Sequence, residues 1–262
     1  MKPITLTTDF GPGEYVATMK GVILSIAKDA RILDVSHTVQ PQDIEQGAYV
    51  LHSALPYFRE GIHVAVIDPE VGTDRKGIIV ECGDHYLVGP DNGLLMPAAR
   101  KLGLKRVIEI ENPEYMLECV SSTFHGRDVF APVAAHISLG VDPEEIGRVT
   151  DEWVDMDFGV YRTRGKELKG RVLHVDSFGN LITNIPAEVV LGKYTFGQKT
   201  EMRIAGKRLT VPFLATYSQL DDRGVLLTIS SSGFLEVAAN RGSAAADLGA
   251  KRGSEIQINP VR

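Results

Sequence analysis

The 262-residue sequence is poor in cysteine and has no excess of basic residues. Its two cysteines, Cys82 and Cys119, are too few for a disulfide framework and show no metal-ligand spacing, so we expect a reducing compartment. Lys and Arg number 28 against 34 Asp and Glu, which gives a formal net charge of -6. A nucleic-acid surface needs clustered cations that neutralise many phosphates together, and the sequence contains no such run. The composition therefore favours small-molecule partners over nucleic acid.

Long apolar runs are also missing. No run approaches the ~18 consecutive apolar residues that mark a membrane-spanning helix. The beginning, "MKPITLTTDFG", lacks the apolar segment of a secretory signal. We therefore expect a cytoplasmic protein without a membrane partner. Apolar residues still make up 44% of the chain and charged residues 24%, a balance typical of a soluble protein that buries a core.

The apolar pattern divides the chain into two parts. In the first, β-branched stretches such as "ITLTTD" and "IHVAVID" alternate with amphipathic stretches such as "EYVATMKGVILSIAKDA", and "KGIIVECGDHYLVGP" indicates a hairpin turning at Gly83 and Asp84. This predicts an α/β N-terminal domain over residues 1–155, with a central, mostly parallel sheet and ligands at the strand ends. After a connector over residues 156–168, short apolar stretches between glycine turns predict a mostly antiparallel β domain over residues 169–262, with a short helix near "GSAAADLG".

A carboxylate follows the first predicted strand. In "TTDFGPGEY", Asp9 precedes glycines that let the backbone approach a ligand closely. Such a carboxylate can accept hydrogen bonds from both hydroxyls of a ribose. The stretch lacks the G-x-G-x-x-G fingerprint, so it does not indicate a nicotinamide or flavin site. The alternative is that Asp9 caps a turn and that Glu14 merely stabilises the first turn of the following helix.

A second group of polar residues combines Asp68 and Arg75, in "VIDPEVGTDR", with His125, in "STFHGRDVF". Together they could orient a water molecule, because the carboxylate accepts a hydrogen of the water while Arg75 keeps that carboxylate ionised. The alternative is an exposed ion pair of little energetic weight and a structural histidine. The histidines form no H-x-x-x-H or H-E-x-x-H pattern, so we expect no zinc site.

The predicted β domain contributes two further groups. One, "VDSFGNLITNI", contains Asp176, Phe178 and Asn180. Phe178 could stack on a flat heterocycle while the amide of Asn180, both donor and acceptor, reads its polar edge. The alternative is turn chemistry alone, in which Asp, Ser, Gly and Asn simply form bends. The other group, "SSSGFLEVAAN", contains Ser231, Ser232 and Asn240.

Taken together, these motifs resemble the S-adenosyl-L-methionine (SAM) hydroxide adenosyltransferases, the adenosine-forming SAM hydrolases related to the fluorinase and chlorinase enzymes. The likeness runs over essentially the whole chain and includes, in the family's order, "TTDFG", "DVSHTVQPQDIEQGAYVL", "VIDPEVGTDR", "GPDNGLL", "TFHGRDVFAPVAAH", "HVDSFGNLITNI" and "SSSGFLEVAANRGSAA". It implies an α/β domain followed by a β domain, and a homotrimer with sites between the N-terminal domain of one subunit and the C-terminal domain of the next. The implied partners are SAM as substrate, with adenosine and L-methionine as products and no cofactor.

The resemblance also implies roles for the N-terminal residues. Asp9 would hold the ribose hydroxyls, and the water that attacks the ribose C5′ in line would be held by Asp68, Arg75 and His125. The halogenating relatives carry Tyr at the position of Asp68 and Trp at that of Gln42, and His125 replaces another of their aromatic residues. These departures favour water over halide as the nucleophile.

The C-terminal residues are implied to bind the rest of the substrate. Phe178, with Tyr217 as a second ring, would sandwich adenine, whose polar edge would be read by Asn180 and the chain around Asn240. Ser232 stands where the halogenating relatives carry an Arg that faces the methionine carboxylate. The residues implied for the methionine ammonium and carboxylate are Asp176, Ser231 and Glu14.

Three other functions stay open at this point. A SAM- or adenosine-binding protein without chemistry would keep the same pocket. A metal-dependent hydrolase would use Asp9, Asp68 and His125 as ligands. A SAM-dependent halogenase would use a halide in place of water.

Overall fold

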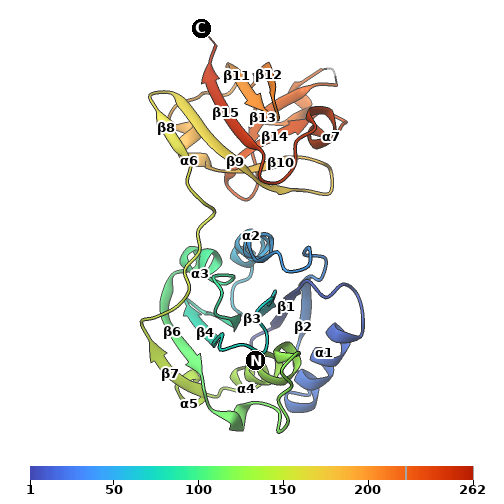
Figure 1. Ribbon diagram of the computed structural model, residues 1–262, viewed down its shortest axis with the longest axis vertical. Helices are drawn as coiled ribbons and strands as arrows, with labels where there is room; N and C mark the ends of the chain where they lie inside the picture. Colours follow the sequence, from blue (N-terminus) through green and yellow to red (C-terminus); the bar gives the residue numbers. More distant parts are fainter. Residues whose placement is uncertain (222, 262) are drawn as a thin grey trace. The chain divides into compact units, whose positions relative to one another are not determined.

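The computed structural model describes residues 1–221 and 223–261, and the chain divides into two units, Met1–Asp157 and Phe158–Arg262 (Figure 1). The division lies within the stretch 156–168 that the sequence indicates as a connector. Each unit has its own hydrophobic core. None of the helices in the described part of the chain is long and apolar enough to cross a membrane.

The N-terminal unit is built on a seven-stranded sheet. Its strands are β1 (Ile4–Thr8), β2 (Ile32–Ser36), β3 (Gly61–Val66), β4 (Gly77–Cys82), β5 (His85–Pro90), β6 (Leu104–Ile110) and β7 (Gly147–Thr150). They lie in the order β2-β1-β3-β5-β4-β6-β7. The pairings among β2, β1, β3 and β5 are parallel, whereas those from β5 to β7 are antiparallel. The sheet is therefore mixed, and the expectation of a mostly parallel sheet holds only for its first half.

The antiparallel half begins at the predicted hairpin. Gly83 and Asp84 alone connect β4 to β5, and a two-residue connection can join only antiparallel neighbours. Gly83 has a φ of 56°, in the left-handed region that such turns require. The hairpin predicted from the sequence is confirmed.

Helices flank this sheet (Figure 1). They are α1 (Glu14–Ile26), α2 (Ile44–Ala54), α3 (Met96–Leu102), α4 (Ala131–Ser138) and α5 (Pro143–Ile146), with the short 3-10 helices η1 (Leu55–Tyr57) and η2 (Pro113–Tyr115) and the π-helical segment η3 (Gly126–Phe130). α1 packs against α4, and α2 packs against α3. Ile4 and Leu6 of β1 share one face of the sheet and join Met19 and Ile23 of α1 in the main core, together with Phe130.

The C-terminal unit is an antiparallel β structure. Its strands are β8 (Arg162–Arg164), β9 (Glu167–Val175), β10 (Leu181–Pro186), β11 (Lys199–Ile204), β12 (Lys207–Pro212), β13 (Val225–Ile229), β14 (Phe234–Ala239) and β15 (Glu255–Pro260). They lie in the order β12-β11-β15-β9-β10-β14-β13, with β8 beside β9. A bridge between Phe213 and Leu227 links the two ends of this order, so the sheet closes toward a barrel. The antiparallel prediction holds, although β8 and the first two residues of β9 lie in the stretch 156–168 indicated as a connector.

Short helical segments complete the C-terminal unit. They are α6 (Ala187–Leu191), α7 (Ala244–Leu248) and the turn η4 (Tyr217–Gln219). α7 is the helix predicted near "GSAAADLG", and it is capped by the Ser243 hydroxyl, which accepts from the Ala246 N–H at 3.2 Å.

The strand β14 shows how the core of this unit is organised. Leu235 and Val237 belong to its hydrophobic cluster, so Glu236 between them lies on the opposite face of the strand.

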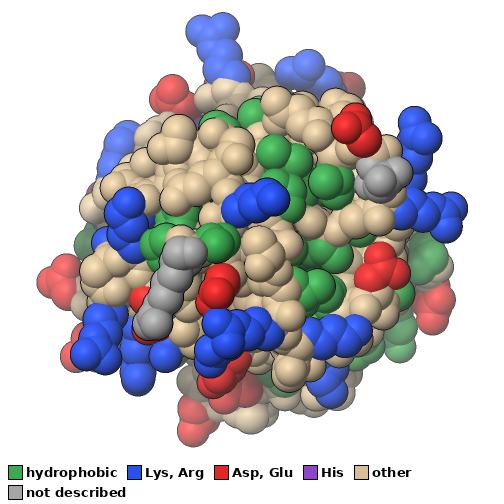
Figure 2. All heavy atoms as spheres, turned by 90° about the horizontal axis from the view of Figure 1, so that it is seen from above, with side chains coloured by type: hydrophobic (Ala, Val, Ile, Leu, Met, Phe, Trp, Pro, Cys, Tyr) green, Lys and Arg blue, Asp and Glu red, His purple; other side chains and the backbone are tan. Residues whose placement is uncertain are grey.

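On the outer surface, Asp and Glu side chains lie among the Lys and Arg side chains, as the face drawn in Figure 2 shows.

Candidate functional site

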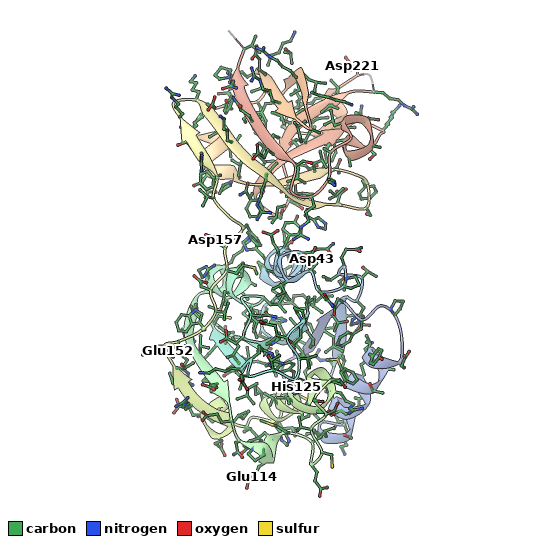
Figure 3. The ribbon with its side chains drawn as sticks, viewed as in Figure 1. Asp43, Glu114, His125, Glu152, Asp157 and Asp221 are labelled. Atoms are coloured by element: carbon green, nitrogen blue, oxygen red, sulfur yellow. The ribbon has the colours of Figure 1, made fainter. Side chains whose placement is uncertain are left out.

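One edge of the N-terminal sheet collects the candidate catalytic residues. Thr8 at the end of β1 is paired with Val66 at the end of β3, and the two strands are parallel. Asp9 and Asp68 therefore both follow the carboxyl ends of these neighbouring strands. His125 comes from a third segment, immediately before η3 and α4 (Figure 3).

Asp68, Arg75 and His125 are in direct contact. Arg75 Nη2 and Nε donate to the two carboxylate oxygens of Asp68 at 2.6 and 3.1 Å, which makes a bidentate pair. The same Nη2 lies 3.0 Å from His125 Nδ1. The side chains of Asp68 and Arg75 are each only 4% exposed. The alternative of an exposed surface pair is therefore wrong.

The turn after β5 fixes both ends of the loop that carries this pair. At the start of the loop, Asn92 Nδ2 donates to the Ile67 carbonyl at 2.9 Å. At its end, the Lys76 carbonyl accepts from the Asp91 N–H at 2.9 Å and from Arg75 Nη1 at 3.0 Å. Sequence reasoning missed Asn92 and Asp91, although the stretch "GPDNGLL" that contains them was part of the family resemblance.

Gly72 lets this loop touch the loop that carries His125. Its φ is +83°, and a Cβ at this position would lie 2.3 Å from the Ser122 carbonyl oxygen. Any side chain would meet both the strained backbone and the carbonyl. The close approach of the two loops keeps Arg75 beside His125.

Burial and charge shift the pKa values of Asp68 and His125 in opposite directions. Burial raises the pKa of the Asp68 carboxyl above its ordinary value, and the Arg75 guanidinium opposes this shift without cancelling it. Burial, reinforced by the charge of Arg75, lowers the pKa of His125. Arg75 thus favours ionised Asp68 as expected, but desolvation sets the net direction.

The contact with Arg75 also fixes the tautomer of His125. A guanidinium N–H can only donate, so Nδ1 of the imidazole is assigned as the acceptor. The neutral ring then carries its proton on Nε2. Asp68 is the hydrogen-bond acceptor of the trio, and His125 offers a donor.

Asp9, the candidate ribose ligand, contacts the loop before α2. Its Oδ2 accepts from the Gln42 N–H at 2.7 Å, and Gln42 has a φ of 65°. This contact fits the alternative in which Asp9 fixes a turn, yet the residue stays partly exposed. Glu14 is exposed at the first position of α1.

The metal-dependent alternative needs three ligands close together. Within residues 1–221 and 223–261, no group of three or more His, Cys, Asp or Glu side chains is arranged to hold a metal ion. Asp68 and His125 instead direct their acceptor atoms at Arg75. Arg75 already takes the Nδ1 lone pair of His125 and one lone pair on each oxygen of Asp68, which leaves further lone pairs on the carboxylate.

In the C-terminal unit, Asp176 organises the turn that carries Phe178. Its Oδ1 accepts from the N–H groups of Phe178 and Asn180 at 2.9 and 2.8 Å, and its Oδ2 accepts from the Asn180 amide at 2.9 Å. Gly179, with a φ of +82°, lies so close to Ser243 that a Cβ would come within 2.0 Å of the hydroxyl oxygen. Phe178 projects from this turn and is 77% exposed. Turn chemistry and an exposed aromatic ring therefore occur together.

The serine and asparagine candidates lie at the two ends of β14. Ser231 is exposed and Ser232 is buried in the turn before the strand, where the Ser232 and Ser230 hydroxyls lie 2.8 Å apart. After the strand, Asn240 Nδ2 donates to the Leu220 carbonyl. Asn240 thus holds the loop that contains η4.

Tyr217 contacts a residue that sequence reasoning missed. Its hydroxyl donates to Oε1 of Glu236 at 2.7 Å, and Glu236 is only 3% exposed. The available signal was an acidic residue inside the apolar stretch "GFLEVAA".

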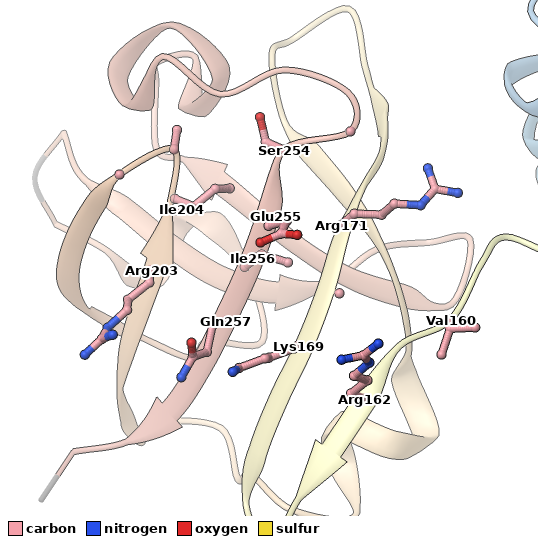
Figure 4. A pocket seen from close by; sticks show the side chains of 14 residues that line it. Val160, Arg162, Lys169, Arg171, Arg203, Ile204, Ser254, Glu255, Ile256 and Gln257 are labelled. Atoms are coloured by element: carbon pink, nitrogen blue, oxygen red, sulfur yellow. The ribbon is translucent and has the colours of Figure 1, made fainter.

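A hollow on the C-terminal unit involves none of these residues. It has a volume of about 780 Å³ and is lined by β8, β9, β11 and β15 (Figure 4). Its charged lining residues are Arg162, Lys169, Arg171, Arg203 and Glu255. The hollow and the candidate site are therefore separate features.

Two family models match the chain. One is described as the SAM hydroxide adenosyltransferase N-terminal domain and matches residues 4–147, and the other is the C-terminal domain of the same family and matches residues 170–257. The matched regions cover the Asp68 cluster in one unit and the Phe178 turn in the other.

Similar proteins span nearly the whole chain. A protein of Methanocaldococcus jannaschii named (R)-S-adenosyl-L-methionine hydrolase is 45% identical, over 97% of this chain and 95% of its own. A fluorinase of Nocardia brasiliensis is 28% identical over 97% of this chain and 96% of its own. A solved structure of an uncharacterized conserved protein from Thermotoga maritima has 35% identity and a TM-score of 0.93, over 97% of this chain and 99% of its own.

We expect Gly72→Ala to lower the free energy of unfolding by about 2–3 kcal/mol, because the new methyl group meets the Ser122 carbonyl at a strained φ. Gly103→Ala is the matched control, since Gly103 has a φ of +86° but nothing within 4 Å of the added Cβ. It should cost only about 1–2 kcal/mol. Denaturant unfolding measures both, and equal losses would show that the contact between the loops is unimportant.

Proposed function

The chain belongs to the SAM hydroxide adenosyltransferase family, and from this we propose that it hydrolyses S-adenosyl-L-methionine to adenosine and L-methionine. The observation that carries the proposal is the buried contact of Asp68, Arg75 and His125. The relative from M. jannaschii is named for the (R) form of SAM, so we take this epimer as the first substrate to assay.

The substrate's leaving group decides which step needs catalysis. Sulfur leaves SAM from a sulfonium, so attack at the ribose C5′ releases a neutral thioether and needs no acid on the departing atom. Only the attacking water therefore needs catalytic assistance. Water has a pKa of about 15.7 and free Asp about 3.9, a gap of roughly 12 units or ~16 kcal/mol. Even with its raised pKa, Asp68 does not form free hydroxide before attack.

The three residues instead orient one water molecule for in-line attack. Asp68 accepts a hydrogen bond from the water, and its raised pKa makes it a better proton acceptor than a free carboxylate. The Nε2–H of His125 holds the water oxygen from a second side, while Arg75 fixes both partners. The proton passes to Asp68 during or after formation of the C–O bond, and the sulfur takes the electrons of the C5′–S bond.

Substrate binding is assigned to the remaining candidates. Asp9 accepts from the ribose hydroxyls, and adenine stacks between Phe178, whose exposed ring supports this role, and Tyr217. The candidates for the polar edge of adenine are Asn180 and Asn240, and those for the methionine part are Asp176, Ser231, Ser232 and Glu14.

Assembly is a further part of the proposal. The water-orienting residues belong to one unit and the adenine-binding residues to the other, which suits a homotrimer with sites between the N-terminal domain of one subunit and the C-terminal domain of the next. The free thiols of Cys82 and Cys119 suit a reducing, cytoplasmic compartment.

Product analysis in ¹⁸O-labelled water tests this function. We expect SAM to yield L-methionine and adenosine with the label in the 5′-hydroxyl, in the presence or absence of EDTA. Both sulfonium epimers belong in the assay, with chloride added in a parallel reaction. Intact bound SAM would indicate a binding protein, loss of activity in EDTA a metal-dependent hydrolase, and a chlorinated nucleoside a halogenase.

We expect Asp68→Asn to lower kcat about 100-fold or more while SAM still binds, because the amide keeps the shape of the carboxylate but is a much weaker proton acceptor. Steady-state kinetics and SAM binding by calorimetry measure the two effects. Asp155→Asn is the matched control, since it removes a carboxylate from the exposed pair with Arg100 in the same unit. Turnover of Asp68→Asn near that of the control would refute the role of Asp68.

The pH dependence follows from the two pKa shifts. The active form needs ionised Asp68 and neutral His125, so kcat/KM should rise with pH and then level off. The pKa of Asp68 lies above its ordinary value of 3.8, so the rise should be centred above that value. The lowered pKa of His125 keeps its imidazole neutral as the pH increases further, so no decline should follow the rise. A pH profile of kcat/KM measures this, and a rise centred at or below 3.8, or a decline above the rise, would contradict the assignment.

A further inference from the structure

The face of β14 that points away from the core carries a buried acid, Glu236, at 3% exposure. Burying a carboxylate is costly unless hydrogen bonds or a cation compensate. No Lys or Arg in the described part of the chain forms an ion pair with it. Its charge is instead met by the hydroxyl of Tyr217, which donates to Oε1 at 2.7 Å. A hydrogen bond to an ionised acceptor is about twice as strong as one between neutral groups.

The hydrogen bond between Tyr217 and Glu236 fixes the Tyr217 side chain, not the backbone of the loop that contains η4. The loop itself is held independently, because Asn240 Nδ2 donates to the Leu220 carbonyl. A capping box between Thr216 and Gln219 also closes the turn η4. Because these two contacts already hold the backbone, the main effect of the hydrogen bond to Glu236 is to orient the Tyr217 ring.

The hydroxyl of Tyr217 is hydrogen-bonded, whereas part of the residue is exposed to solvent. Tyr217 is 43% exposed although its hydroxyl is bound to a buried residue. Burial, together with the hydrogen bond to Glu236, raises the pKa of the hydroxyl, so it stays protonated and able to donate. The turn that carries Phe178 lies near this pair, because it leads directly into β10, where Ile182 is paired with Glu236.

We propose that Glu236 is a positioning residue that holds the Tyr217 ring in place as one wall of the nucleobase pocket, opposite Phe178. The proposal rests on the proposed function for the identity of the nucleobase. A tyrosine ring free to rotate would lose side-chain entropy on stacking, whereas a ring fixed by its hydroxyl has lost it already. Glu236 therefore acts on substrate affinity and not on the reacting atoms.

The test compares Glu236→Ala, Glu236→Gln, Tyr217→Phe and the double variant Tyr217→Phe/Glu236→Ala in the full-length protein. We expect Glu236→Ala to raise KM for SAM and Kd for adenosine about 10-fold, with kcat within about twofold of wild type. Tyr217→Phe should match it, and the double variant should be no worse, because both changes remove the same hydrogen bond. Glu236→Gln keeps an acceptor oxygen and should stay within about threefold of wild type.

Tyr194→Phe is the matched control. It removes another tyrosine hydroxyl of the same unit, which donates to the Lys166 carbonyl at 2.6 Å, and it should leave KM and the Kd for adenosine unchanged. A purely structural role for Glu236 would lower the melting temperature and the fraction of active protein while the KM of the folded fraction stays constant. That result, or additive losses in the double variant, would overturn the proposal.

Adenosine binding separates this inference from the proposed function. If wild type binds adenosine but releases no product from SAM, the hydrolase function fails, and the adenosine affinities of the variants still decide the role of Glu236. If wild type neither turns over SAM nor binds adenosine, both proposals are wrong.

Discussion

A guanidinium enclosed between a carboxylate and an imidazole organises the candidate site of the N-terminal unit. Arg75 is almost fully buried, so its charge needs compensation, and the two oxygens of Asp68 supply it. The spare N–H of the same group then directs the lone pair of His125 inward. One buried cation thus decides which atoms of its neighbours remain available to a substrate. Two further contacts hold the loop that carries Arg75 in place. They are the hydrogen bond from Asn92 to the Ile67 carbonyl and the close approach of Gly72 to Ser122.

Much of the architecture could be predicted because it depends on local patterns. The hairpin at Gly83 follows from a two-residue turn, and the division of the chain into an alternating part and a β part follows from a change in apolar period. The predicted hairpin implies one antiparallel pair, but the extension of the antiparallel half beyond it could not be predicted, since β4 and β6 are joined by a connection long enough for either direction. Tertiary packing, rather than local sequence, decides such pairings.

The candidate site was predictable in part for a similar reason. Asp68 follows directly after an apolar strand, and a charged residue in that place is visible in the sequence. Asn92 acts on a backbone carbonyl far away in the chain, and Glu236 acts on a tyrosine hydroxyl. Neither contact has a local sequence pattern. The bidentate geometry that separates a buried pair from a surface pair also requires coordinates.

The turn around Asp176 holds an exposed aromatic ring on an ordered backbone. Two backbone N–H groups and one amide lock it, so Phe178 is displayed on a rigid support even though its ring faces solvent. An aromatic surface that is already ordered sheds weakly held water when a flat ring arrives, with little loss of backbone freedom. The C-terminal unit therefore exposes an apolar ring on an ordered turn, and a flat molecule that stacked on it would displace this water without further ordering of the turn.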